Sequence, residues 1–183
     1  ASVETIAWTG SSRQNEANQG KTPKPHVQCE NTHAMGNSMG NQREFYDLYE
    51  KYPALCGEFI WDFKDQGLEV PVPGNNKKTY WAYGGDFGDN PNSGNFCTNG
   101  VVLPDLTLTA KSYNVKKIYQ PADFVMNDSV KGKFTIKNKL NFRPLSDYDF
   151  SYTVLEDGVE ISRGTIDGVD VAPEKTKQIT LSN

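Results

Sequence analysis

The sequence predicts an α/β region followed by a separate all-β region. Residues 26–61 contain a strand, a helix and a second strand in succession, and residues 109–119 carry a further helical pattern. After residue 120 the apolar residues alternate or cluster in short runs, as they do in strands. The change of character at Gln120-Pro121 divides the chain into an expected first domain, 1–120, and an expected second domain, 121–183.

The N-terminal stretch carries little information. Residues 1–25 are polar and rich in Gly, Ser and Pro, which predicts a loop with one short strand over residues 3–8. Two runs then predict buried strands, over residues 26–30 and 55–61. With a helix between them, they predict a parallel strand–helix–strand unit.

The helix is expected over residues 41–52, where Phe45, Leu48, Tyr49 and Tyr52 follow the spacing of one buried face. Asn41 and Glu44 have the spacing of a capping box, and Pro53 ends the helix.

Residues 62–104 predict a long, irregular but ordered loop. Seven glycines and four prolines lie between Gly67 and Pro104, together with several aromatic residues that favour packing within the loop. The next helix is expected over residues 109–119, with Ala110, Tyr113 and Ile118 on its inner side.

The second domain predicts an antiparallel sandwich. Its strands are expected over residues 133–140, 148–155, 159–165 and 178–181, and Asp157-Gly158 indicates a hairpin turn. About 60 residues are fewer than the ~100 that a complete immunoglobulin-like sandwich needs, so we expect a partial one.

Composition excludes some classes of function. The net charge is -4 and no basic stretch is dense enough to indicate a nucleic-acid partner. The apolar runs are too short for a transmembrane helix, so no membrane partner is expected. Three cysteines without metal-like spacing, Cys29, Cys56 and Cys97, are expected to be buried free thiols. The compartment stays unknown, with cytoplasm and periplasm both open.

Four segments carry a family resemblance: CENTHAMGNS (residues 29–38), GEFIWDFKDQG (57–67), WAYGGDFGD (81–89) and NFCTNGVV (95–102). In this order and spacing they resemble the family 2 glycoside hydrolases, most closely their β-galactosidases. The resemblance covers roughly residues 24–120; residues 121–183 fit the family's next domain only by position and β character. It implies the last βα units of a (β/α)8 TIM barrel, followed by a partial immunoglobulin-like β-sandwich. A complete barrel needs about 200–250 residues, so 183 residues correspond to a piece.

The candidate site begins with Glu30, a carboxylate at the end of a strand, where α/β barrels keep catalytic acids. The resemblance implies that Glu30 is the nucleophile of a retaining glycosidase. It also implies that His33 contacts sugar hydroxyls and that Trp61 stacks on the sugar face. The alternatives are a structural acid, a loop-anchoring histidine and a core tryptophan.

A cation site is implied by the same resemblance. The Phe96 carbonyl and the Asn99 side chain would ligate Na+, and Asn99 would border the substrate; the alternative is ordinary loop packing. The resemblance also implies that the acid/base Glu and the Mg2+ ligands of the parent enzyme lie on earlier strands, outside this chain. Asp62 and Asp65 are expected to brace the loop.

The sequence departs from the family pattern at three positions. Asn31 and Thr32 stand where Tyr and Ala are usual, and Glu58 stands where Gly is usual. Strand alternation places Glu58 toward the helix layer rather than the sugar, so we do not expect it to be the acid/base catalyst.

The resemblance favours part of a retaining β-galactosidase that hydrolyses terminal β-D-galactosides, and we expect the chain to be inactive in isolation. Its partners would be a carbohydrate substrate and the remainder of the parent enzyme, itself expected to be a homo-oligomer. A non-catalytic carbohydrate-binding or assembly module stays open, as does a β-glucuronidase or β-mannosidase specificity.

Overall fold

The structure, a computed structural model, describes residues 4–5 and 25–181 and divides into two compact units, residues 1–118 and 119–183. The division falls between Ile118 and Tyr119, near the change of character in the sequence. The identity of each unit as a domain stays a prediction at this point.

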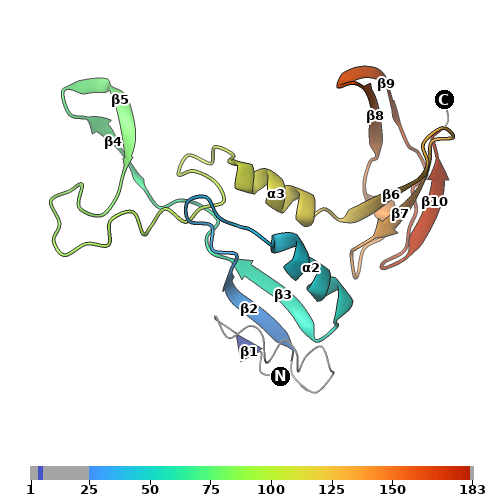
Figure 1. Ribbon diagram of the computed structural model, residues 1–183, viewed down its shortest axis with the longest axis horizontal. Helices are drawn as coiled ribbons and strands as arrows, with labels where there is room; N and C mark the ends of the chain where they lie inside the picture. The colour runs from blue at the N-terminus through green and yellow to red at the C-terminus, as the bar shows by residue number, and fades with distance from the viewer. Residues whose placement is uncertain (1–3, 6–24, 182–183) are drawn as a thin grey trace. The chain divides into compact units, whose positions relative to one another are not determined.

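A three-stranded parallel sheet organises the first unit (Figure 1). Its order is β1 (Glu4–Thr5), β2 (His26–Asn31) and β3 (Leu55–Ile60). Helix α2 (Gln42–Lys51) connects β2 to β3, which are parallel neighbours. The predicted strand–helix–strand unit is confirmed. β1 lies within the strand expected over residues 3–8, whose other positions are outside the described residues.

Helix α2 ends as predicted but begins differently. Tyr52 closes the helix by donating its N–H to the Leu48 carbonyl, immediately before Pro53. The predicted capping box is wrong: Asn41 has a φ of 60° and makes no side-chain capping bond. An N-cap side chain reaches the first free N–H groups from an extended backbone, which left-handed Asn41 does not have. The predicted inner residues, Phe45, Leu48, Tyr49 and Tyr52, are all partly buried.

The prediction of an irregular loop over residues 62–104 is wrong for its first half. β4 (Leu68–Val72) and β5 (Asn75–Ala82) form an antiparallel hairpin. The hairpin was not predicted because prolines and glycines usually indicate a loop. The strand tolerates Pro71, which has no N–H, because Pro71 lies at a register shift. Gly74 makes the turn with a φ of 76°.

Helix α3 (Ala110–Ile118) confirms the second predicted helix, but only part of its predicted inner side. Ile118 is buried, whereas Ala110 and Tyr113 are exposed. The inward side is shifted by one or two positions: Val115 packs against a buried cluster of Ala34, Met39, Val101 and Val102. Ser112 on the same side donates its hydroxyl to the Val101 carbonyl at 2.9 Å.

The second unit holds two antiparallel sheets. One has the order β10-β7-β6 and the other is a hairpin of β8 and β9. The strands are β6 (Ala122–Asp128), β7 (Lys133–Asn138), β8 (Ser151–Glu156), β9 (Val159–Thr165) and β10 (Thr176–Thr180). β7 to β10 were expected and β6 was not. The predicted turn at Asp157-Gly158 is confirmed, with φ values of 48° and 82°. The immunoglobulin-like arrangement stays a prediction.

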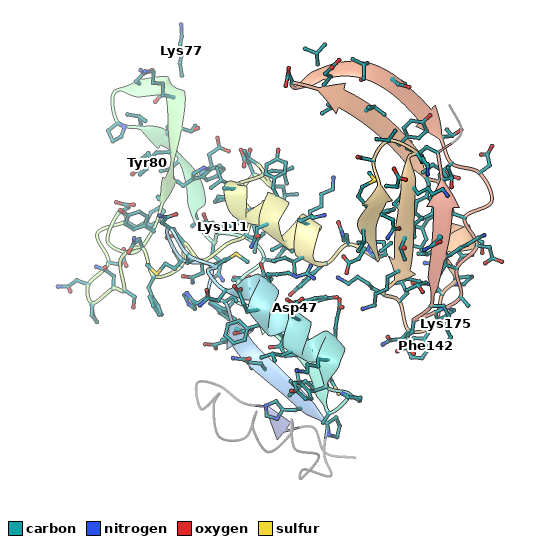
Figure 2. The ribbon with its side chains drawn as sticks, turned by 45° about the vertical axis from the view of Figure 1, so that its right-hand side comes forward. Asp47, Lys77, Tyr80, Lys111, Phe142 and Lys175 are labelled. Carbon is teal, nitrogen blue, oxygen red and sulfur yellow. The ribbon has the colours of Figure 1, made fainter. Side chains whose placement is uncertain are left out.

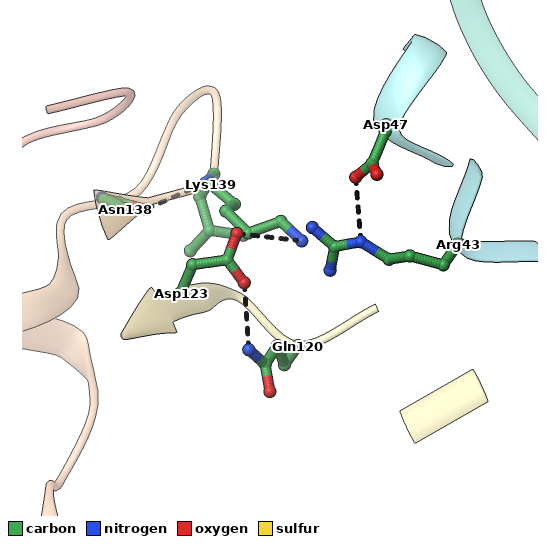
Figure 3. Close-up of polar contacts among 7 residues, drawn as sticks. Arg43, Asp47, Gln120, Asp123, Asn138 and Lys139 are labelled. Atoms are coloured by element: carbon green, nitrogen blue, oxygen red, sulfur yellow. Dashed lines mark hydrogen bonds and ion pairs between the residues drawn. The ribbon is translucent and has the colours of Figure 1, made fainter. Parts of the chain in front are cut away.

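An apolar cluster forms the core of this unit. Its buried members are Ala122, Phe134, Ile136, Leu145, Val169 and Val171. At one edge, Asp123 accepts a hydrogen bond from Gln120 at 3.0 Å and lies 3.8 Å from the Lys139 ammonium (Figure 3). These contacts tie the first residues of the unit to β6 and to the end of β7.

Two expectations from composition can be compared with the structure. No helix among the described residues has the length and apolar character that crossing a bilayer requires. All three cysteines are free, but the expectation that they are buried is wrong for Cys56, which is exposed on β3. Cys29 and Cys97 are partly buried.

Candidate active site

The end of β2 contains a β-bulge at Glu30. Gln28 pairs with Glu58 and Asn31 pairs with Ile60, so Cys29 and Glu30 together oppose a single residue of β3. Glu30 has a φ of 52°, in the left-handed region that non-glycine residues rarely adopt. Bulges often lie beside active sites, where they re-aim a side chain. Here the bulge leaves Glu30 exposed, while Asn31 is 4% exposed.

A network of four polar side chains lies between this strand end and α2. The Asn31 amide donates to the Glu58 carboxylate and, at 3.3 Å, to the Tyr49 hydroxyl. The Tyr49 hydroxyl donates to Gln28 Oε1 at 3.0 Å and lies 3.5 Å from Glu58. Burial raises the pKa of Tyr49 above its ordinary value, and the charge and hydrogen bond of Glu58 raise it further. Tyr49 therefore stays a protonated donor.

The network explains the unusual Glu58. Its predicted orientation toward the helix layer is confirmed, because its partners include Tyr49 on α2. Glu58 and Asn31 are two of the three positions at which the sequence departs from the family pattern, and they are bonded to each other.

The loop after β2 is fixed at the fully buried Ala34. Ala34 donates its N–H to the Trp61 carbonyl at 2.6 Å. Lys111, labelled on α3 in Figure 2, donates from Nζ to the Ala34 carbonyl at 2.6 Å. His33, the residue before Ala34, stacks on Phe96 with ring centroids 6.2 Å apart. Both Trp61 and α3 thus hold the loop that carries His33 and that directly follows the end of β2, where Glu30 lies.

The segment after Trp61 is joined to residues 97–102 mainly through the backbone. The Asp62 N–H donates to the Asn99 carbonyl at 2.7 Å, and four further backbone hydrogen bonds join the two segments. Asp65 Oδ1 accepts the Gly100 N–H at 2.5 Å, and Asp62 Oδ2 accepts the Gln66 amide at 2.6 Å. The prediction that Asp62 and Asp65 brace the loop is confirmed.

An open pocket of about 340 Å³ lies beside this braced loop. Three predicted site residues line it: Trp61, Phe96 and Asn99. Glu30 and His33 are not among its lining residues, although His33 stacks on one of them, Phe96. The residues that sequence reasoning missed are Gln66, Gly84, Asp89, Asn92, Ser93, Gly94 and Cys97. Most of these belong to, or adjoin, the WAYGGDFGD and NFCTNGVV segments, and that position in the sequence could have indicated them as pocket residues.

The donor atoms of Phe96 and Asn99 fit a cation with oxygen ligands. Asn99 is 3% exposed and donates Nδ2 to the Phe96 carbonyl at 2.7 Å. Its Oδ1 is buried and has no hydrogen-bond partner among the described residues. A buried acceptor of this kind suits a hard cation. No group of three His, Cys, Asp or Glu suited to a metal occurs within residues 4–5 and 25–181.

Comparison with known proteins finds one enzyme family. A family model described as "Glycosyl hydrolases family 2, TIM barrel domain" matches residues 3–124, and one described as "Beta-galactosidase, domain 4" matches residues 134–183. The chain is 46% identical over 159 residues to a β-galactosidase of Priestia megaterium, covering 87% of this chain and 15% of that protein. It is 38% identical to one of Photobacterium profundum, covering 86% and 15%, and 40% identical to one of Clostridium acetobutylicum, covering 86% and 17%. The chain therefore spans about 15% of the length of these relatives.

Proposed function

The chain belongs to glycoside hydrolase family 2, and we propose that it supplies the nucleophile and part of the sugar site of a retaining β-galactosidase. The observation that carries the proposal is Glu30, an exposed carboxylate turned by a bulge at the carboxyl end of a parallel strand. In such barrels catalytic residues occupy these strand ends. The first unit would then be the last βα units of the barrel, and the second a partial immunoglobulin-like sandwich.

The proposed reaction has two steps. A Glu30 oxygen attacks the anomeric carbon of a terminal β-D-galactoside while the bond to the leaving oxygen breaks, and that oxygen takes a proton from an acid residue. In the second step, water gives its proton to the same residue and attacks the anomeric carbon, which releases galactose and Glu30. The two carboxyl groups of retaining enzymes lie about 5–5.5 Å apart. The acid/base residue would come from outside this chain.

The other predicted residues would orient the sugar. Trp61, 42% exposed at the pocket, offers an apolar surface for the sugar face. His33 and Asn99 would bond to hydroxyl groups. The Phe96 carbonyl and Asn99 Oδ1 would hold Na+, which supplies an electrostatic anchor for a hydroxyl, whereas Mg2+ in the parent enzyme would have its ligands outside this chain.

The test is Glu30→Gln in the full-length enzyme that carries this chain. Hydrolysis of a chromogenic aryl β-galactoside should fall by about 10³-fold or more, the scale of losing a covalent catalyst. Glu44→Gln, an exposed carboxylate in the first turn of α2, is the matched control and should keep its activity. Retained activity in Glu30→Gln would refute the nucleophile assignment.

Further measurements test the sugar specificity and the alternative of a non-catalytic carbohydrate-binding module. The isolated 183-residue chain should be inactive, because it lacks the acid. Aryl β-glucuronides and β-mannosides should be poorer substrates for the full-length enzyme than the galactoside. Galactose binding by the isolated chain that is lost on Trp61→Ala, together with an active Glu30→Gln enzyme, would instead favour a carbohydrate-binding module.

A further inference from the structure

We propose that Asn31 and Glu58 form a positioning pair that holds the β-bulge at Glu30 and so aims the nucleophile. The proposal rests on the proposed function, because it assumes that Glu30 is the attacking group. It assigns Glu58 a role in the reaction without contact with the substrate.

The orientation of two β2 residues carries the argument. Gln28 and Asn31 are three positions apart, and in a regular strand such residues point to opposite faces. Here both reach the Tyr49 hydroxyl on α2. They share a face only because the bulge adds one residue between them. The network therefore exists only in the bulged register, and its bonds stabilise that register.

The alternative register shows what the pair prevents. In a regular strand Glu30 would share the face of Gln28, toward α2 and away from the exposed position it has here. That register would also remove the nearly buried Asn31 amide from the Glu58 carboxylate. An unpaired buried donor is costly, and a bond to a charged acceptor is among the stronger hydrogen bonds in proteins. The Asn31–Glu58 bond thus favours the register in which Glu30 is exposed.

The backbone on both sides of Asn31 is strained, and the Asn31–Glu58 pair would hold it in that conformation. Glu30 and Thr32 have φ values of 52° and 45°, and such conformations persist only where their surroundings hold them. Asn31 lies between these two residues, and its side chain is bonded to both β3 and α2. Loosening it allows the strained residues to relax, which displaces Glu30.

The experiment uses the full-length enzyme with Glu58→Ala, Glu58→Gln, Asn31→Ala and the double variant Asn31→Ala/Glu58→Ala. Two substrates separate the roles: dinitrophenyl β-galactoside, whose leaving group needs no acid, and phenyl β-galactoside, whose leaving group does. Glu69→Ala is the matched control, because Glu69 is also a strand carboxylate that accepts a side-chain hydrogen bond, from Thr79 at 2.8 Å.

We expect Glu58→Ala and Asn31→Ala each to lower kcat about tenfold or more on both substrates, with KM changed less than about twofold, because a small misplacement of a reacting group is costly. Glu58→Gln should recover most of the rate, since its amide oxygen still accepts from Asn31. The double variant should be no slower than either single variant, as expected for residues that act through one bond. Tyr49→Phe, which keeps the ring packing, should show a smaller loss of the same kind.

Other outcomes would overturn the proposal. A loss confined to phenyl galactoside, equal in Glu58→Ala and Glu58→Gln, would make Glu58 the proton donor. Additive losses in the double variant would separate the two residues. Full activity in Glu58→Ala beside an inactive Glu30→Gln would overturn the positioning pair and leave the proposed function intact, whereas an active Glu30→Gln would refute the function itself.

Discussion

Two segments of the candidate site, residues 30–36 and residues 97–102, are held in place by different kinds of hydrogen bond. The first segment, residues 30–36, comprises the end of β2 and the loop after it, and it is held largely by the side chains of Asn31, Tyr49, Glu58 and Lys111. Residues 97–102 are held mainly by backbone hydrogen bonds to residues 62–66. The first arrangement depends on which side chains are present, and the second depends on how closely two backbones approach.

The difference shows where such a site can vary. All three departures from the family pattern, Asn31, Thr32 and Glu58, lie in or against the side-chain-held loop. A side-chain contact can be replaced by another pair of matching shape and polarity. A backbone contact has no such substitute, so we expect a graded response to mutation in the first segment and an abrupt one in the second.

The largest expected effect is that of Gly100→Ala. A Cβ at Gly100 would lie 2.0 Å from the Asp65 nitrogen and 2.3 Å from the Val102 oxygen, so two backbones would have to separate. We expect a loss of about 3 kcal/mol or more in stability, or no soluble enzyme, measured by the midpoint of thermal inactivation. Gly40→Ala, which meets no atom within 4 Å, is the control. A normal midpoint for Gly100→Ala would contradict the close approach of these backbones.

Lys111→Met should have an intermediate effect on stability and on kcat. It removes the bond from Nζ to the buried Ala34 carbonyl and leaves that acceptor unpaired, at a cost of about 1–3 kcal/mol. Because the same loop carries His33 and directly follows Glu30 at the end of β2, kcat on the aryl galactoside should fall several-fold, with partial recovery in Lys111→Arg. Lys116→Met, on the exposed side of the same helix, should behave as wild type. Equal behaviour of the two methionine variants would show that Lys111 does not hold the loop.

The smallest expected effect is a pH dependence of stability that arises from Tyr49. Its pKa is raised in the folded state, first by burial and then by Glu58, so above pH ~10 the folded protein binds more protons than the unfolded chain. The stabilising contribution is complete below pH ~10 and is lost as the pH rises further. The slope should be a fraction of the ~1.4 kcal/mol per pH unit of one fully shifted group, because Tyr49 is only partly buried.

Unfolding measured between pH 9 and pH 11 should show this slope in the wild type and in Tyr113→Phe, but less of it in Tyr49→Phe. Tyr113 is 63% exposed and serves as the control. An identical slope in Tyr49→Phe would assign the pH dependence to other groups.

Much of the fold followed from local patterns. The strand–helix–strand unit, helix α3 and strands β7 to β10 were predicted because hydrophobic spacing and turn residues act over a few positions. The hairpin β4–β5 was missed because prolines and glycines weaken those local signals, and the cap at Asn41 was misjudged because its backbone is left-handed.

By itself, the sequence determined which residues are candidates for chemistry: Glu30 at a strand end, and His33, Trp61, Phe96 and Asn99 in the recognisable segments. Only the tertiary structure decided how they are presented. The bulge under Glu30, the bonding of Asn31 to Glu58 and the pocket shared by Trp61, Phe96 and Asn99 each join residues distant in the chain. Residue type and spacing are local properties, whereas register, burial and hydrogen-bond partners depend on which strands and helices come together.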